Sequence, residues 1–206
     1  MNDKLFAIFV FYPLLLFCLS FHESAHAWMA NKLGDDTAKL LGRITLNPFP
    51  HMDPIGTVFL PLMSLLTGVS LFGWGKPVPV NSYHFKNPRR GTLWVAIAGP
   101  ISNILLAVLF AGLFRLIVAK MPAFDSLLQI LQTGVILNLV LAFFNLIPIF
   151  PLDGGNVLRG LLPERWIPAY DSFAHYSIFL LLLLFVSGFL RYVMIPVALA
   201  ANLLLP

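Results

Sequence analysis

Charged residues are scarce in this chain: they form 11% of its 206 residues, whereas 59% are hydrophobic. A soluble domain carries about twice that charged fraction, so the composition excludes an ordinary soluble enzyme. The mean hydropathy of +0.86 is typical of a polytopic membrane protein that lies in a lipid bilayer. The net charge of +4 is small and sits in connecting loops, which suits membrane orientation better than nucleic-acid binding, so no nucleic-acid partner is expected.

Cysteine is nearly absent as well. Cys18 is the only one, which rules out an intrachain disulfide and a cysteine cluster that binds a metal. The sequence also lacks the long Gly/Ser linker, internal repeat or disordered tail that would mark a second domain. Residues 1–206 are therefore expected to form a single integral-membrane domain.

What is present is a series of long apolar segments. Five of them could enter a membrane: 5–29, 55–72, 93–118, 127–150 and 173–205. The last is too long for one crossing of ~30 Å at ~1.5 Å per residue, and we expect it to break near Gly188 and Arg191. The predicted fold is all-α, a polytopic membrane helix bundle. The first segment could instead be a signal peptide, but cleavage at Ala25-His26-Ala27 would disrupt the motif described next.

The first segment contains an H-E-x-x-H motif, His22-Glu23-Ser24-Ala25-His26. Residues four apart on a helix lie on one face, so both imidazoles can bind one Zn²⁺. Glu23 lies beside them, where it can take a proton from zinc-bound water. The alternative is that these side chains only satisfy one another inside a helix bundle. We favour the metal site, because ionisable residues at membrane depth are costly and usually functional.

A catalytic zinc normally has three protein ligands and a water, so a third ligand must come from elsewhere. Asp153 stands apart from the other acidic residues because it ends an apolar run, whereas most of them lie in polar connections or near chain ends. Pro148 and Pro151 prevent a regular helix before it, so we expect a broken helix that lines a wet cavity at the metal site. On local sequence alone, Asp153 could equally cap the helix that begins near Asn156.

Three stretches of the sequence carry a family resemblance: His22-Glu23-x-x-His26, Ala98-Gly99-Pro100-x-x-Asn103, and Asn145-x-x-Pro148-x-x-Pro151-Leu152-Asp153-Gly154. Together they resemble the site-2 protease family of intramembrane zinc metalloproteases. The resemblance implies that Asp153 is the third ligand of one Zn²⁺ per chain. It also implies that the substrate is a transmembrane protein cut in or near its membrane segment. The chain has no room for the accessory domains of many relatives, so a compact form is expected.

Two asparagines and a glycine within these stretches are candidates for binding the substrate. A buried amide such as that of Asn145 or Asn103 must find partners in a bilayer, and hydrogen bonding between helices is the simplest role. Either amide could instead donate to the developing oxyanion or hold the substrate backbone extended. Gly154 could line a water-accessible pocket that accepts the unwound substrate strand.

His51 and Asp53 form a separate polar pair in His51-Met52-Asp53-Pro54. An interfacial turn is the simpler interpretation of this pair. The two side chains could instead gate the site or supply an extra metal contact.

Positive charge distinguishes the connections between the apolar segments. Lysines and arginines cluster after the first segment, before the third and after the fourth, whereas the turn between the third and fourth holds Lys120 alone. The positive-inside rule therefore predicts that these three connections, and the active site with them, face the cytoplasm. We expect a multi-pass protein of a prokaryotic cell membrane. His22 and Asp153 can share one zinc only if an even number of crossings separates the first segment from the third. We therefore predict that 53–74 is re-entrant and turns near Pro61 to Gly68.

The predicted function is a zinc-dependent endopeptidase that hydrolyses peptide bonds in or near transmembrane segments. A metal transporter or a metal-binding membrane protein without hydrolytic activity would also place His and Asp at membrane depth. That alternative gives no special reason for Glu23 between the two histidines.

Overall fold

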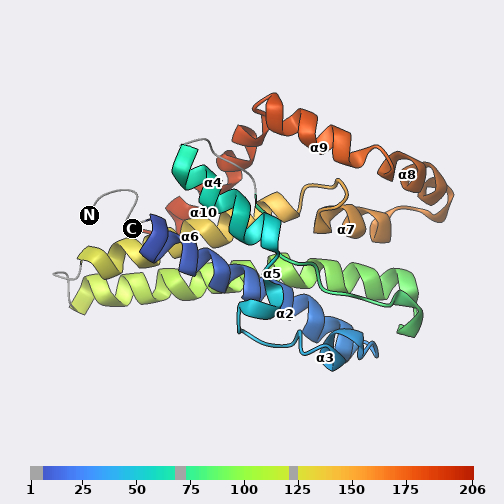
Figure 1. Ribbon diagram of the computed structural model, residues 1–206, viewed down its shortest axis with the longest axis horizontal. Helices are drawn as coiled ribbons and strands as arrows, with labels where there is room; N and C mark the ends of the chain where they lie inside the picture. Colours follow the sequence, from blue (N-terminus) through green and yellow to red (C-terminus); the bar gives the residue numbers. More distant parts are fainter. Residues whose placement is uncertain (1–6, 68–72, 121–124) are drawn as a thin grey trace.

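The computed structural model describes residues 7–67, 73–120 and 125–206, and within these ranges the protein is all-α, as predicted. Figure 1 shows that the helices run mostly along the long axis of an elongated bundle. Two helices, α5 (Pro88–Lys120) and α6 (Asp125–Asn145), form an antiparallel hairpin at its centre. They pack closely because Gly134 on α6 leaves room for the ring of Phe110 on α5, which lies 2.8 Å from where a Cβ would stand.

The same two helices are the described ones that are long and apolar enough to cross a membrane. A third span is possible if the bent pair α8 and α9, which meets at 65°, counts as one. A helix pairs most of its backbone groups internally, which is what a bilayer requires of a spanning segment, although Pro100 inside α5 has no N–H to donate. These features describe a membrane protein.

Helix α2 (Tyr12–Lys32) carries the H-E-x-x-H motif and packs across α5. A short π-helical turn, η1 (Ala7–Phe11), precedes it. The buried residues of α2 are mostly small or polar and include Cys18, Ser20, His22, Ser24 and His26. In a bilayer the apolar side chains can face lipid, so a helix hides its polar face inside the protein.

The connection between α2 and α5 is built from short helices. These are α3 (Thr37–Leu40), η2 (Phe49–His51), η3 (Pro54–Phe59), α4 (Leu60–Thr67) and η4 (Ser82–His84). Trp74 N–H donates to Gly56 O at 3.3 Å, and the Thr57 hydroxyl donates to Trp74 O at 2.9 Å. The two ends of the segment 53–74 thus lie side by side, as a re-entrant segment requires.

The predicted break at Pro61 is wrong, because α4 continues through it. Helix η3 runs directly into α4, so Pro61 lies inside a continuous helical segment, 54–67, that changes from π-helix to α-helix at Leu60. Gly68, the other end of the predicted turn, lies outside the described residues.

The chain after α6 forms a second layer in the upper part of Figure 1. It consists of α7 (Asp153–Leu161), η5 (Glu164–Trp166), α8 (Ile167–Ala174), α9 (Ser177–Val186), η6 (Phe189–Val193) and α10 (Met194–Leu204). The predicted break near Gly188 is confirmed: Gly188 has a φ of +71°, a left-handed conformation that favours glycine, and η6 follows it. Helix α10 then packs against the α5–α6 hairpin through a small apolar core made of Ala107, Ala111, Val135, Leu139 and Val197.

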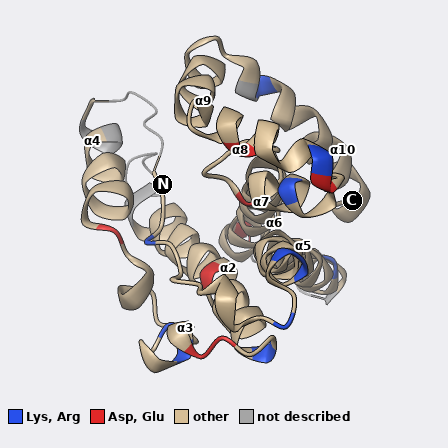
Figure 2. Cartoon of the chain, turned by 90° about the vertical axis from the view of Figure 1, so that its right-hand side faces the viewer, with Lys and Arg blue, Asp and Glu red and all other residues tan. Residues whose placement is uncertain are grey.

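Charged residues gather at the ends of the bundle. Figure 2 looks at the end where α5 begins, and Lys and Arg residues surround α3 and the start of α5 there. Arg89 at that end donates to Gly160 O at 3.1 Å and to Leu162 O, which satisfies carbonyls at the end of α7. Helix α7 is therefore fixed to α5 at its last turn, far from the residue that begins it.

Candidate metal centre

Two helices bring three potential ligands to one point. His22 and His26 lie one turn apart on α2, and Asp153 is the first residue of α7. His22 Nε2 lies 3.0 Å from His26 Nε2 and 3.0 Å from Asp153 Oδ2, and the third side of this triangle measures 3.3 Å. Among the described residues these three form the one cluster of at least three His, Cys, Asp or Glu side chains that could hold a metal ion.

The hydrogen bond made by Nδ1 of each imidazole determines which ring nitrogen carries the hydrogen. His22 Nδ1 is 2.5 Å from Asn103 Oδ1, and His26 Nδ1 is 2.7 Å from Val95 O. Both partners can only accept hydrogen bonds, so in the neutral rings both Nδ1 atoms carry the hydrogen. Both Nε2 atoms then present lone pairs toward Asp153 Oδ2.

This arrangement fits a cation. Asp153 Oδ2 is buried and has no hydrogen-bond partner, although two imidazole nitrogens lie within 3.3 Å of it. Three acceptor atoms that face one another without a hydrogen repel, and a divalent ion between them removes that repulsion. Ligand atoms held at ~2.1 Å by one tetrahedral zinc lie ~3.4 Å apart, close to the spacing observed. The two Nδ1 hydrogen bonds are the outer contacts that metal-binding histidines normally make.

A buried amide network supports His22 from behind. Asn103 Nδ2 donates to Asn138 Oδ1 at 2.7 Å, and Asn138 Nδ2 donates to Gly134 O at 2.8 Å. Asn138 also lies 3.1 Å from Cys18 Sγ. Both asparagines are fully buried, and these bonds satisfy amides that would be costly in an apolar bundle. The sequence interpretation missed Asn138, although a polar residue inside the apolar run 127–150 was a signal for it.

Gly99 allows α5 to lie against the two imidazoles. A Cβ at this position would stand 2.6 Å from His22 Cε1 and would also meet the His26 ring. No real side chain fits at that distance without displacing a ring. The glycine in Ala98-Gly99-Pro100 is thus explained by the close approach of the two imidazole rings rather than by backbone conformation.

Asp153 is presented by an irregular stretch, as the two prolines predict. Helix α6 ends at Asn145 and α7 begins at Asp153, with turns between them. The cap position of α7 is Leu152, and no side chain caps it, so the alternative that Asp153 caps a helix near Asn156 is not what the structure shows. Tyr170 OH secures the stretch by donating to Pro148 O at 3.2 Å and Gly155 O at 3.1 Å.

Glu23 lies next to the histidines on α2 but outside the three-atom cluster. It is partly buried, and its Oε2 accepts a hydrogen bond from Val78 N–H at 3.1 Å. Val78 belongs to the described stretch 73–81 before η4, which forms no helix or strand. The carboxylate is therefore held by backbone that comes from a distant part of the sequence.

The remaining predicted site residues lie outside the cluster. Asn145 Nδ2 donates to Leu141 O at 3.0 Å within its own helix. Gly154 is buried, and a Cβ there would overlap the backbone of Leu146 and Ile147, so close packing requires a residue without a side chain. Roles of Asn145, Asn103 and Gly154 in binding the substrate stay predictions.

His51 and Asp53 also have structural partners. His51 is buried, and its Nε2 lies 2.8 Å from Thr45 O. Asp53 Oδ1 caps η3 by accepting from Ile55 N–H at 3.0 Å and Gly56 N–H at 2.7 Å. This is the geometry of the turn interpretation. A gating role for the pair stays a prediction.

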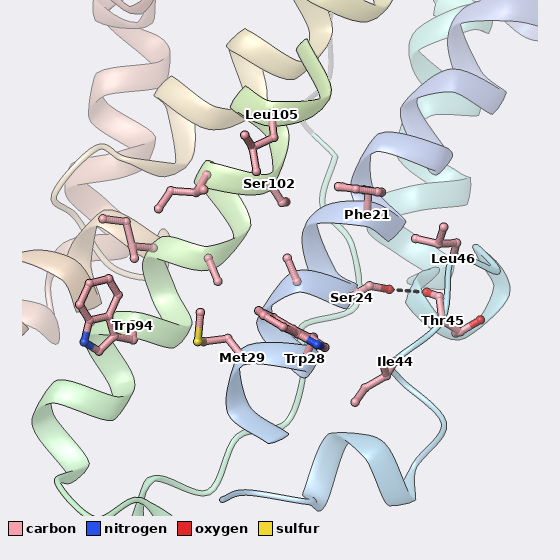
Figure 3. A pocket seen from close by; sticks show the side chains of 14 residues that line it. Phe21, Ser24, Trp28, Met29, Ile44, Thr45, Leu46, Trp94, Ser102 and Leu105 are labelled. Carbon is pink, nitrogen blue, oxygen red and sulfur yellow. Dashed lines mark hydrogen bonds between the residues drawn. The ribbon is translucent and has the colours of Figure 1, made fainter. Parts of the chain in front are cut away.

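An apolar cavity of about 600 Å³ lies between α2, α5 and residues 44–46. Figure 3 shows Trp28 and Trp94 at one part of its lining and Phe21 and Leu105 at another. None of the three cluster residues nor Glu23 lines it. The cavity is therefore separate from the candidate metal centre.

A fold of apolar helices around a His–His–Asp cluster, with both histidines buried and Asp153 partly buried, defines a membrane-embedded metal-binding protein. Comparison with known proteins narrows the class. The profile described as peptidase family M50 matches residues 111–187. YwhC of Bacillus subtilis (strain 168), whose name describes it provisionally as a zinc metalloprotease, is 40% identical over 204 residues and is covered to 89%. The chain belongs to peptidase family M50, the site-2 protease family, which confirms the resemblance inferred from the motifs.

More distant relatives are longer than this chain. Zinc metalloprotease MJ0392 of Methanocaldococcus jannaschii is 31% identical over 169 residues, which are 81% of this chain and 38% of that protein. Rip2 of Mycobacterium tuberculosis H37Rv, also named provisionally as a zinc metalloprotease, is 32% identical, with 84% of this chain and 64% of that protein covered. No solved structure gives a significant match.

Proposed function

We propose that this chain is a zinc-dependent endopeptidase that cleaves membrane proteins in or near their transmembrane segments. The observation that carries the proposal is the convergence of His22 Nε2, His26 Nε2 and Asp153 Oδ2 within 3.3 Å of one another, with Glu23 adjacent in sequence. Membership of a peptidase family and relatives named as zinc metalloproteases support it.

In this proposal, His22, His26 and Asp153 hold one Zn²⁺ per chain. Bound zinc supplies Lewis acidity, which polarises a carbonyl and makes water more acidic. The protein's part is to fix the donor set: Asn103 and Val95 O orient the imidazoles so that both Nε2 lone pairs point inward. Three protein ligands leave a position open for the reaction, as in other catalytic zinc sites.

Glu23 is the general base of the proposal. It takes a proton from the attacking water and then returns one to the leaving amine, as a positioned carboxylate can do in peptide hydrolysis. The peptide bond breaks between the carbonyl carbon and that amine. Glu23 is suited to this because Val78 N–H holds its Oε2 and the histidines flank it on α2.

The surroundings of the site favour a membrane-protein substrate. The cluster lies among α2, α5 and α7 in a bundle whose helices α5 and α6 are apolar enough to span a bilayer. A transmembrane helix shields its carbonyls with its own hydrogen bonds, so it must unwind locally before it is cut. The proposal takes residues 1–206 as one catalytic domain, in a prokaryotic cell membrane, with its site toward the cytoplasm.

The test is co-expression with a panel of tagged single-span membrane proteins. Wild type is expected to shorten at least one of them, and Glu23→Gln is expected to leave it intact while keeping zinc. Glu164→Gln is the matched control, since Glu164 is the only other glutamate and its side chain is 91% exposed. Cleavage by Glu23→Gln at the wild-type level contradicts the proposal. Zinc uptake into vesicles by wild type, without cleavage, would favour a transporter instead.

A further inference from the structure

Residues 76–79 pass beside the Glu23 carboxylate. The sequence of this segment determines which of its backbone N–H groups can donate to Glu23. Prolines lack an N–H and hold the residue before them in an extended conformation. In Lys76-Pro77-Val78-Pro79 this leaves Val78 as the only residue from 77 to 79 with a backbone N–H. That N–H is the one that donates to Glu23 Oε2, at 3.1 Å.

Arg43 holds the other side of the same peptide group. Its Nη1 donates to Pro77 O at 3.2 Å, and its Nη2 donates to Lys76 O at 2.5 Å. Pro77 O and Val78 N–H belong to one planar peptide unit and point in opposite directions when the bond is trans. Arg43 and Glu23 are therefore joined through a single rigid group, and hydrogen bonds in such a chain strengthen one another.

The neighbouring backbone is anchored as well. His51 O accepts from Lys76 N–H at 2.8 Å, and the Thr57 hydroxyl donates to Trp74 O at 2.9 Å. Further along, Asp35 Oδ2 accepts from Asn81 N–H at 2.6 Å. The peptide between Pro77 and Val78 thus sits in the middle of a segment that is fixed on both sides.

The burial of the Arg43 side chain is not explained by an ion pair. It is 5% exposed, its Nε has no hydrogen-bond partner, and it forms no ion pair with any described residue. Burying a guanidinium without a directly paired carboxylate is costly. The acidic group whose charge acts on it is Glu23, across the Pro77–Val78 peptide.

We propose that Arg43 is a positioning residue for the hydrolysis: through the Pro77–Val78 peptide it fixes the orientation of the Glu23 carboxylate. With Oε2 held by Val78 N–H, rotation of the carboxylate is restricted and Oε1 is left to receive the proton. A general base must lie within hydrogen-bond reach of the proton it takes, so loss of this orientation slows the chemical step. The inference rests on the proposed function of Glu23.

The experiment compares two pairs of variants. Arg43→Gln removes the charge and the paired donors, while Arg43→Lys keeps the charge but donates from one point. Val78→Pro removes the N–H, whereas Val78→Ala keeps it and trims the side chain. The measurements are kcat and KM on a single-span protein cleaved in the panel above, zinc per chain, and hydrogen–deuterium exchange of the peptide 74–82.

Arg43→Gln and Val78→Pro are expected to lower kcat by about 10- to 100-fold, the size of effect seen when an outer contact to a metal ligand is lost. KM and zinc content are expected to stay near wild type. Arg43→Lys should restore part of kcat, and Val78→Ala should resemble wild type. Arg43→Gln should also speed amide exchange in 74–82, a readout independent of activity.

Three results overturn the inference. They are wild-type kcat in Arg43→Gln or Val78→Pro, unchanged exchange in Arg43→Gln, and loss of zinc in parallel with activity, which would indicate a merely structural role. Failure of the proposed function is recognised separately, because it requires cleavage by Glu23→Gln or no zinc-dependent cleavage by wild type.

Discussion

Removing the amide of Asn103 tests whether the outer contacts of the histidines set metal affinity. Asn103→Leu is close to isosteric but removes the acceptor that lies 2.5 Å from His22 Nδ1 and the donor to Asn138 Oδ1. Loss of an outer-shell partner typically weakens metal binding 10- to 100-fold, which corresponds to about 1.4–2.7 kcal/mol. Leaving the Asn138 carbonyl unsatisfied in the bundle costs a further ~1–3 kcal/mol of folding stability.

The control for this prediction is Asn103→Asp. A carboxylate still accepts from His22 Nδ1–H but cannot donate to Asn138 when ionised, so it separates the two roles. We expect Asn103→Leu to bind zinc more weakly than Asn103→Asp in a competition titration of the apoprotein with a fluorescent chelator in detergent. Wild-type zinc affinity in Asn103→Leu, together with a reduced kcat, would refute this reasoning and would favour the oxyanion role instead.

Three further predictions concern the three cluster residues, Gly99 and Asp35. Replacing His22, His26 or Asp153 with alanine should abolish activity through loss of zinc, seen by metal analysis, and treating wild type with a chelator should do the same until zinc is restored. Gly99→Ala should weaken zinc binding because its methyl would meet both imidazole rings; equal zinc occupancy at limiting metal would contradict that packing argument. Burial raises the pKa of Asp35, but hydrogen bonds from Thr37, Asn81 N–H and His84 outweigh it and hold the pKa below its ordinary value. A carboxyl group whose pKa is lower in the folded state stabilises the fold at pH values above its pKa in the unfolded chain, and this stabilisation is lost as the pH falls below about 4. The melting temperature of Asp35→Asn, measured from pH 7 to 3, should therefore depend less on pH than that of wild type.

The sequence predicted the three residues of the candidate metal cluster better than it predicted the groups that hydrogen-bond to them. His22 and His26 are four residues apart, so helix geometry alone places them together. Local sequence left Asp153 equally suited to capping a helix, and only the family resemblance of the motif around it implied that it joins the histidines. Val95 O, by contrast, is a backbone carbonyl 69 residues from its partner His26, and no side-chain pattern marks it.

Arg43 and Asn138 were missed for a related reason. The carbonyls that Arg43 contacts lie 33 or more residues away in the sequence. Cys18, which Asn138 contacts, lies 120 residues away. Such contacts depend on how the helices pack, which local pattern does not specify. For the segment 53–74, a long-range requirement predicted the path of the chain better than the local pattern did. Hydropathy alone favoured a simple span for 55–72. The requirement that His22 and Asp153 share one ion predicted the return of the chain, which the bond from Trp74 to Gly56 bears out.

The separation of the ligands along the chain has a consequence for biosynthesis. His22 and His26 leave the ribosome early, whereas Asp153 follows only after more than half of the chain has been made. Asp153 reaches the histidines only once α7 has docked on α5, where Arg89 holds its far end. The complete donor set therefore requires that α2, α5, α6 and α7 have all been made. A nascent chain that ends before Asp153 therefore lacks part of the donor set.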